Sequence, residues 1–228
     1  MYKLGALHTI KPTGAVHNAS VIFLHGSGDT GKGVLDWVKF LHKNFSSPHI
    51  KFLFPTAPTR PYTFIGGEPS TVWFDRYKLT PEVPEHEESI SMIQTEIKKI
   101  IDEEIKSGVP LSRIVIGGFS MGGALSLHLA YRFIPGLAGV FALSSFLNNG
   151  SAVYNNIKSI DTPLFMCHGD KDEMVPLQWG KDTFDQLTQL GVKGEFMKLP
   201  NTFHELKSKE IERLLKWIEM RLPPTVKN

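Results

Sequence analysis

Residues 113–128 read Arg113-Ile-Val-Ile-Gly-Gly-Phe-Ser120-Met-Gly-Gly-Ala-Leu-Ser-Leu-His128, and this stretch decides the fold of the chain. Its β-branched run at 114–116 predicts a buried strand, and the apolar pattern from residue 124 onward predicts a helix. The turn between them holds Gly118-Phe-Ser120-Met-Gly122, which matches the G-x-S-x-G nucleophile elbow. Glycine neighbours allow a serine to occupy such a tight turn at the N-terminus of a helix. The turn therefore predicts a nucleophilic serine, with the N–H of Met121 facing a developing oxyanion.

The pentapeptide alone is weak evidence, because G-x-S-x-G also arises by chance. The alternative is a glycine-rich link between a strand and a helix, with an incidental serine. The context favours the elbow: a strand precedes it, a helix follows it, and the additional Gly123 lets that helix pack close to the sheet.

Length and composition limit the class of protein. The 228 residues, 41% of them hydrophobic, suffice for one well-buried domain, and we expect residues 1–228 to form a single one. A net charge of +2 without long runs of one sign argues against nucleic acid as a partner. Cys167 is the single cysteine, so no intramolecular disulfide can form, and we expect a packed small hydrophobe there. The first residues lack a signal-peptide core and no apolar run could span a bilayer, so we expect a cytoplasmic enzyme or binding protein.

Strands and helices are expected to alternate along the chain. Apolar and β-branched runs predict strands at 4–10, 19–24, 50–54, 114–116, 137–143, 163–167 and 194–199. Helical spacing of apolar residues predicts helices at 34–41, at 85–106, after the elbow, at 177–190, and near the C-terminus with Ile211, Leu214, Leu215, Ile218 and Leu222 buried. This alternation predicts an α/β fold, with a mostly parallel central sheet and helices on both faces.

One long segment, from Pro55 to Glu85, is rich in proline and glycine and lacks periodicity. Such a segment inside a compact domain is usually functional or disordered. It carries aromatic residues that disordered segments tend to lack, so we expect it to be ordered and to lie over the site.

Polar groups follow three of the predicted strands: Ser120, the pair Asp170 and Asp172, and His204. Parallel sheets place their functional residues at the carboxyl ends of the strands. The order Ser, Asp, His is that of the α/β-hydrolases. A serine needs a base at neutral pH, histidine suits that role, and a carboxylate orients the imidazole and stabilises its cationic form.

The base is predicted to be His204 because it lies after the last strand and before the last helix, where the order requires it. His25 and His168 each occupy a His-Gly pair at a strand end, where a structural hydrogen bond is the simpler role. His128 lies within the helix that follows the elbow and is expected to be packed. The alternative for His204 is an ordinary loop histidine.

The acid is predicted to be Asp172, because it stands farther into its loop and the apolar residues 174–176 can anchor that loop. Asp170 immediately follows His-Gly and can simply brace the turn. The second oxyanion donor is expected in the loop after the strand at 19–24, as the backbone N–H of Ser27.

The same loop, 26–33, nearly matches the phosphate-binding pattern G-x-x-x-x-G-K-[ST], but Gly33 replaces the hydroxyl that would hold Mg²⁺. No spaced Cys/His cluster supports a zinc site either. We therefore expect neither a metal nor an organic cofactor.

Several motifs together resemble the acyl-protein thioesterase/lysophospholipase family of serine α/β-hydrolases. They occur in order over nearly the whole chain: Leu24-His-Gly-Ser-Gly-Asp-Thr-Gly31, Phe54-Pro-Thr-Ala-Pro58, Trp73-Phe-Asp75, Gly117-Gly-Phe-Ser-Met-Gly-Gly123 and His168-Gly-Asp-Lys-Asp-Glu-Met-Val-Pro176. The resemblance implies an α/β-hydrolase fold with Ser120 as nucleophile, Asp172 as acid, His204 as base, and the N–H groups of Ser27 and Met121 as oxyanion donors. This agrees with the assignments made from the residues.

The resemblance also implies the class of substrate. Family members hydrolyse thioesters of palmitoylated cysteines, or oxygen esters of lysophospholipids and small acyl groups. Acyl-protein thioesterases usually carry an apolar residue in place of Ser27 and Gln in place of Met121. The lysophospholipase-like branch has Ser and Met there, as this chain does, and its shortened acyl tunnel would favour short chains.

The expected reaction is a two-step hydrolysis of an acylated protein, a lysophospholipid or a small acyl ester through an acyl-enzyme. Trp73, Phe74, Phe146 and Leu147 are expected to form an apolar acyl pocket, with ordinary core packing as the alternative. We further expect a monomer or weak dimer, with transient contact to a membrane surface. Alternative functions are a short-chain carboxylesterase with little action on protein thioesters, a peptidase of the same fold, and a binding module that has lost turnover.

Overall fold

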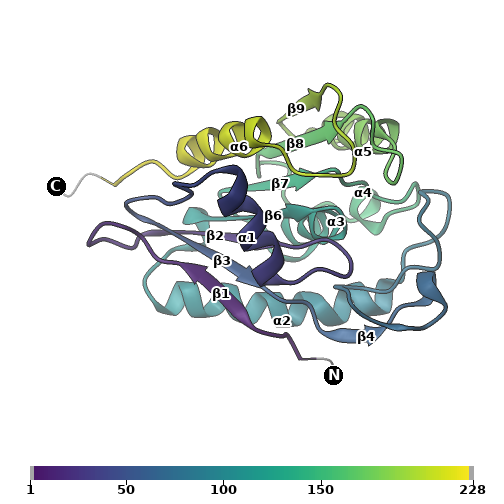
Figure 1. The fold of residues 1–228 in the computed structure, drawn as a ribbon, viewed down its shortest axis with the longest axis horizontal. Coiled ribbons are helices and arrows are strands. Elements are labelled where there is room, and N and C mark those ends of the chain that lie inside the picture. The colour runs from purple at the N-terminus through teal and green to yellow at the C-terminus, as the bar shows by residue number, and fades with distance from the viewer. Residues whose placement is uncertain (1–2, 226–228) are drawn as a thin grey trace.

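A seven-stranded sheet forms the centre of the fold in the computed structural model, which describes residues 3–225. The strand order is β1-β3-β2-β6-β7-β8-β9, and only β1 at one edge runs antiparallel to its neighbour (Figure 1). The strands are β1 (Leu7–Ile10), β2 (Ala19–Leu24), β3 (Ile50–Pro55), β6 (Ile114–Phe119), β7 (Gly139–Leu143), β8 (Leu164–Gly169) and β9 (Gly194–Leu199). The predicted α/β-hydrolase fold with a mostly parallel sheet is confirmed.

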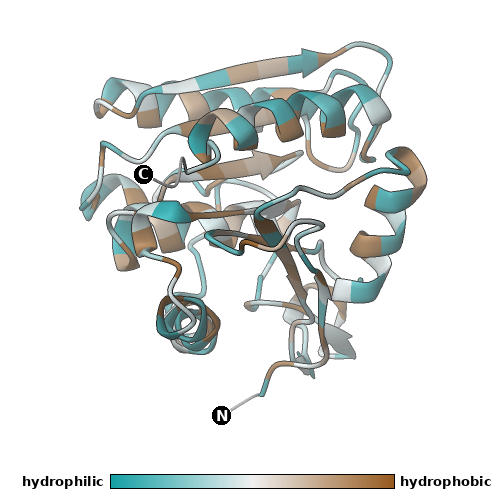
Figure 2. Cartoon of the chain, turned by 90° about the vertical axis from the view of Figure 1, so that its left-hand side faces the viewer, coloured by the Kyte–Doolittle hydropathy of each residue, from teal (hydrophilic) through white to brown (hydrophobic). Residues whose placement is uncertain are grey.

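Side chains of the central strands alternate between two apolar layers, as the pleat requires. In β7, Val140 and Ala142 belong to one buried cluster, whereas Phe141 and Leu143 belong to the other. Because both faces are buried, the strands read as continuous apolar runs. In Figure 2 the strands are mostly brown, while the helices carry both brown and teal residues.

Helices cover both faces of the sheet (Figure 1). On one face lie α1 (Gly31–Leu41) and α6 (Ser208–Arg221), whose buried residues share a cluster with Phe141. On the other lie α2 (Glu87–Lys106), α3 (Met121–His128), α4 (Ala152–Asn155) and α5 (Leu177–Gln189). Among the described residues, no helix is long and apolar enough to cross a membrane.

The segment between β3 and α2 is ordered, as its aromatic content predicts. Two short antiparallel strands, β4 (Thr59–Pro61) and β5 (Pro69–Thr71), flank a single 3₁₀ turn at Thr63–Ile65. The carboxylate of Asp75 fastens this hairpin, because it accepts hydrogen bonds from the N–H of Thr63 at 2.8 Å and from its hydroxyl at 2.6 Å.

Several element boundaries differ from the prediction for local reasons. The helix expected at 85–106 begins at Glu87, because His86 caps it and the carboxylate of Glu85 is bonded elsewhere. The first strand spans only Leu7–Ile10, where its residues pair with β3. The elbow helix begins at Met121, directly after the serine, and continues from Leu129 to Phe133 as a π-helical turn.

Candidate active site

The serine of the elbow has a backbone conformation that few residues adopt. Ser120 has φ 53° and ψ −119° between β6 and α3. Its N–H donates to the carbonyl of Leu143 at 2.8 Å, and the hydroxyl of Ser145 donates to its carbonyl at 2.8 Å. A strained residue persists only where its surroundings fix it. The neighbouring strand β7 and the loop after it therefore hold Ser120 at the carboxyl end of the sheet.

Two glycines permit the turn because the backbone of β2 passes very close. A Cβ at Gly118 would lie 2.3 Å from the carbonyl oxygen of Leu24, and one at Gly122 would lie 2.2 Å from the same atom. Any side chain at either position would collide with the backbone of β2. The close passage of that strand therefore explains why both positions must be glycine.

His204 and Asp172 form a hydrogen-bonded pair, with 2.7 Å between Nδ1 and Oδ2. The other carboxylate oxygen of Asp172 accepts the N–H groups of Met174 at 3.1 Å and Val175 at 2.8 Å. Burial alone would raise the pKa of Asp172, but hydrogen bonds from His168, His204 and the Val175 N–H hold it well below its usual range. Asp172 is therefore an anion that orients His204.

The ring of His204 also packs on Phe119, the residue before the elbow serine, with 4.7 Å between the ring centroids. Ser120 and His204 line the same cleft. The structure thus brings together the three side chains that the sequence predicts as a triad, from the ends of β6, β8 and β9.

Asp170, the rejected acid, braces the turn after β9. Its carboxylate accepts the N–H of Asn201 at 2.7 Å and lies 3.9 Å from the ammonium of Lys198. It makes no contact with His204 among the interactions of residues 3–225, which agrees with the choice of Asp172 as the partner of the histidine.

His168 lies against the acid, a placement that the sequence does not reveal. Its buried Nε2 is 2.7 Å from the carbonyl oxygen of Val175 and 3.5 Å from Oδ2 of Asp172. A Cβ at Gly180 would come within 2.2 Å of its Nδ1, so α5 closes tightly over the ring. In the sequence, only the i, i+4 spacing of His168 and Asp172 pointed to this contact. Such spacing also occurs in many pairs of residues that do not interact.

His25 supports the loop that carries Ser27. One ring nitrogen lies 2.7 Å from the carbonyl oxygen of Gly26, and the other accepts the N–H of Ala57 at 2.9 Å. Burial lowers the pKa of His25, so the neutral ring is favoured. The indole N–H of Trp73 donates to its carbonyl at 2.8 Å, which ties this loop to the segment after β5.

The two residues predicted to supply the oxyanion donors touch through their side chains. Met121 is the first residue of α3, where a backbone N–H has no acceptor within the helix. The hydrogen bonds within residues 3–225 likewise leave the N–H of Ser27 without an acceptor. The hydroxyl of Ser27 donates to the sulfur of Met121 at 3.6 Å, so the two residues are in direct contact.

A cleft of about 420 Å³ opens beside Ser120. The long segment 55–85 contributes five of its lining residues, as expected for a segment that lies over the site: Tyr62, Phe64, Ile65, Ser70 and Leu79. Trp37, Phe119 and Met174 complete much of the apolar wall.

The four residues expected to form an acyl pocket do not line this cleft. Trp73, Phe74, Phe146 and Leu147 are each at most 3% exposed and pack in the interior. Trp73, Phe74 and Leu147 belong to the apolar core beneath the sheet, and Phe146 packs against Trp179. These four residues therefore have the positions that the core-packing alternative expected. The guanidinium of Arg76 packs against the rings of Phe74 and Phe146.

The loop at 26–33, which nearly matches the phosphate-binding pattern, leads into α1 and caps it. Thr30 caps α1 by accepting the N–H of Gly33 at 3.0 Å. Lys32 is exposed and pairs with Asp36 on the same helix, so its ammonium does not turn back toward the loop.

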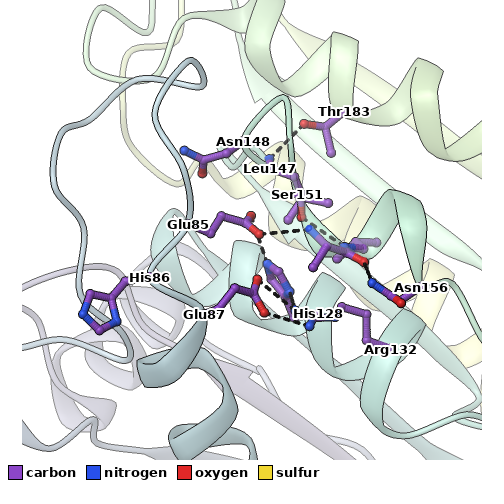
Figure 3. Close-up of polar contacts among 12 residues, drawn as sticks. Glu85, His86, Glu87, His128, Arg132, Leu147, Asn148, Ser151, Asn156 and Thr183 are labelled. Atoms are coloured by element: carbon purple, nitrogen blue, oxygen red, sulfur yellow. Dashed lines mark hydrogen bonds and ion pairs between the residues drawn. The ribbon is translucent and has the colours of Figure 1, made fainter.

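A separate polar cluster ties the segment after β5 to the far side of α3 (Figure 3). Nε2 of His128 lies 3.1 Å from Glu85, and its Nδ1 lies 2.9 Å from the guanidinium of Arg132, which also pairs with Glu87. Glu85, Glu87 and His128 could supply three metal ligands, but Arg132 already occupies the lone pair of His128 and one of the carboxylates. The cluster is therefore a structural clamp.

Comparison with known proteins shows the family of the chain. The profile of the phospholipase/carboxylesterase family matches residues 6–222. The chain belongs to this family. Its relatives include mouse lysophospholipase-like protein 1, which is 50% identical over 218 residues that cover 94% of this chain and 91% of the mouse protein.

Two further members of the family support the assignment. Acyl-protein thioesterase 1 homolog 1 of Dictyostelium discoideum is 38% identical over 214 residues, covering 91% of this chain and 92% of that protein. The crystal structure of acyl-protein thioesterase 2 of Zea mays superposes with a TM-score of 0.80 at 28% identity, over 96% of this chain and 99% of that chain. The predicted membership in the acyl-protein thioesterase/lysophospholipase group of serine hydrolases is thus confirmed.

Proposed function

We propose that this serine hydrolase cleaves acyl esters or thioesters through a triad of Ser120, His204 and Asp172. One observation carries the proposal: a serine at a strained elbow shares a cleft with a histidine that is hydrogen-bonded to a buried carboxylate at 2.7 Å. This arrangement supplies a nucleophile, a base and a group that orients the base.

In the first step the hydroxyl oxygen of Ser120 forms a bond to the acyl carbon while Nε2 of His204 takes its proton. The N–H groups of Ser27 and Met121 stabilise the negative charge on the acyl oxygen. The C–S or C–O bond then breaks, and the proton on His204 passes to the leaving thiol or alcohol. A water activated by His204 releases the carboxylic acid and restores Ser120.

Two substrate ranges remain within this reaction. The acyl-protein thioesterase relatives support action on thioesters of acylated proteins, and the lysophospholipase-like relative supports action on lysophospholipids. The short-chain alternative is favoured by the burial of all four residues that were expected to form an apolar acyl pocket, since none of them lines the cleft. The peptidase and binding-module alternatives gain no support from this cleft.

Contact with a membrane surface fits the exposed apolar side chains around the cleft. Phe64 and Ile65 are each 44% exposed, Met174 is 57% exposed, and Phe203 beside His204 is 55% exposed. A lipid-bound substrate would present its acyl group to such a rim. The monomeric or weakly dimeric state and the cytoplasmic location stay predictions.

The test is kcat/KM for matched oxygen esters and thioesters from acetyl to palmitoyl, with Ser120→Ala as the blank. We expect Ser120→Ala to lose activity by roughly 10⁴-fold or more, because the members of a triad act as a unit. A preference for long-chain thioesters would support a protein depalmitoylase, and a preference for short oxygen esters would support a small-ester hydrolase. Undiminished hydrolysis by Ser120→Ala would refute the mechanism.

A further inference from the structure

Residues 79–84, near the end of the long segment between β3 and α2, are held by another part of the chain. The backbone hydrogen bonds within residues 3–225 include none that an N–H of residues 79–84 donates. Leu79 nevertheless lines the cleft beside Ser120. The wall of a cleft must have a fixed position if it is to orient a bound substrate. The groups that fix Leu79 therefore lie outside this stretch.

Three carbonyl groups of the stretch accept hydrogen bonds from two adjacent asparagines in the loop after β7. The side-chain amide of Asn148 donates to the carbonyl of Thr80 at 3.1 Å and to that of Val83 at 2.8 Å. The backbone N–H of Asn149 donates to the carbonyl of Pro81 at 2.8 Å. Asn148 is 5% exposed, whereas Asn149 is exposed. One buried amide thus spans the turn that follows Leu79.

The loop that carries Asn148 is itself fixed to the elbow and to α5. The N–H of Ser120 donates to the carbonyl of Leu143, and the hydroxyl of Ser145 donates to the carbonyl of Ser120, both at 2.8 Å. The N–H of Leu147 donates to the hydroxyl of Thr183 at 2.9 Å (Figure 3). Asn148 therefore stands on the same support that holds the elbow serine.

The bond from Asn148 to Thr80 is the hydrogen bond nearest to Leu79 along residues 3–225. Thr80 follows Leu79 directly, so a shift of its carbonyl also moves Leu79. The next anchor toward α2 lies farther along, where the carboxylate of Glu85 accepts the N–H of Ala152 at 3.3 Å. The position of Leu79 in the cleft thus depends directly on Asn148.

An asparagine suits this place for a chemical reason. Its Nδ2 carries two hydrogens, and both are used here for carbonyl groups of one turn. A serine could donate only one such bond, and an ionised aspartate could donate none. Closing the loop needs only a backbone bond such as that of Asn149. The two bonds from the Asn148 side chain additionally fix the direction in which the turn leaves Leu79.

We propose that Asn148 is a positioning residue for the hydrolysis, because its amide holds Leu79 in the wall against which the bound substrate packs. Asn148 touches neither the substrate nor the reacting atoms, and it acts through Leu79. The inference rests on the proposed hydrolase function and deepens it by naming a residue outside the cleft that governs binding within it.

A double-mutant cycle in the full chain tests this route, with Asn148→Ala, Leu79→Ala and the double variant. We expect each single change to raise KM for nitrophenyl butyrate about 3–10-fold, the effect of one or two lost methylene contacts, with kcat within about twofold of the parent. In the Leu79→Ala background, Asn148→Ala should change kcat/KM by less than about twofold, because the wall that it positions is already gone.

Asn149→Ala is the matched control. It changes an exposed asparagine next to Asn148 and keeps the backbone N–H that bonds to Pro81, so its KM and kcat should equal those of the parent.

The outcomes separate the inference from the function on which it rests. Additive losses in the cycle would overturn the inference, because Asn148 would then act by a route other than Leu79. A fall in kcat at unchanged KM would overturn it as well, since the loop would then act on Ser120 through Ser145. Both results leave the hydrolase proposal intact. A parent protein that neither hydrolyses the ester nor reacts with a fluorophosphonate at Ser120 would instead refute the proposed function.

A second variant keeps the test decisive if Asn148→Ala does not fold. Asn148→Ser then takes its place in the cycle, because the hydroxyl can still donate one hydrogen bond. We expect a smaller rise in KM, which should again vanish in the Leu79→Ala background. A rise that persists in that background would overturn the role of Asn148.

Discussion

The hydroxyl of Ser27 donates a hydrogen bond to the sulfur of Met121 at 3.6 Å, and these two residues carry the backbone N–H groups proposed to bind the oxyanion. Ser27 comes from the loop after β2 and Met121 from the start of α3, so this contact connects the two halves of the oxyanion site. The Tyr62 hydroxyl interacts with the same serine. The Ser27 side chain thus helps to fix the spacing of two donors whose geometry governs the stabilisation of the transition state.

Replacing Ser27 with alanine keeps its N–H and removes its side-chain contacts with Met121 and with the Tyr62 hydroxyl. We expect kcat for an acetyl ester to fall by about 2–10-fold with little change in KM, which corresponds to one ordinary hydrogen bond. Ser46→Ala, an exposed hydroxyl on another loop, is the control and should match the parent. A Ser27→Ala enzyme with the parent's kcat would show that the hydroxyl does not position the donors.

Asp172 should make the stability of the protein sensitive to acid. Its pKa is lower in the folded state than in the unfolded chain, so its contribution is complete above the unfolded value near 4 and is lost as the pH falls further. Asp172→Asn lacks this titration. We expect its free energy of unfolding to fall less steeply than that of the parent below about pH 4, measured by urea denaturation at several pH values. Parallel curves would contradict the assignment.

Glu210 should have the opposite effect on stability. This residue of α6 is 0% exposed, Oε1 has no hydrogen-bond partner, and burial raises the pKa of its carboxyl to about 7. A raised carboxyl pKa favours folding at low pH, and the advantage is lost as the pH rises from about 4.5 to about 7. Glu210→Gln cannot ionise, so we expect it to gain stability over the parent above pH 7, by at most about 3 kcal/mol.

The measurement for Glu210 is the difference in melting temperature between variant and parent at pH 5 and pH 8. Glu212→Gln, in the same helix at a more exposed position, is the matched control and should show no such difference. A constant gap between Glu210→Gln and the parent at both pH values would contradict a buried titrating carboxyl.

The clamp around His128 predicts unequal costs for two neighbouring glutamates. Glu85 is 5% exposed and bonded to His128, whereas Glu87 is 44% exposed at its pair with Arg132. We expect Glu85→Ala to lower the free energy of unfolding by about 3 kcal/mol, because it leaves buried donors unpaired. Glu87→Ala should cost less than about 1 kcal/mol. Urea denaturation of both variants checks this, and equal costs would contradict the clamp.

The grouping of Ser120, Asp172 and His204 could be predicted from the sequence, because each residue follows a strand that is recognisable by its apolar run. Parallel pairing then brings Ser120, Asp172 and His204 to the same edge of the sheet, whatever the details of packing. The need for glycine at the elbow could also be predicted from the local motif. The structure gives the reason, because a Cβ at Gly118 or Gly122 would collide with the carbonyl oxygen of Leu24. The fold and the meeting of these three side chains at one edge of the sheet could therefore be predicted from the sequence.

The positions of the residues expected to form an acyl pocket could not be predicted in this way. Phe74 and Phe146 are aromatic residues near strand ends, which is equally typical of a pocket wall and of core. Both rings pack against the guanidinium of Arg76. The spacing of apolar residues in the sequence does not predict that this charged residue is buried. The contact of His168 with Asp172 was hidden for a related reason, because it depends on how the loop after β8 curls back.

The wide separation of the triad along the chain has a consequence for biosynthesis. The elbow that carries Ser120 is complete once β6 and α3 exist, but the histidine proposed as its base arrives only with the loop after β9, at residue 204 of 228. A nascent chain that has emerged only as far as β8 therefore carries an elbow serine with no histidine to activate it. From the proposed mechanism we expect ribosome-bound intermediates to be inert toward cellular esters, and reactivity of Ser120 toward a serine-directed probe to mark the moment at which the last strand has docked.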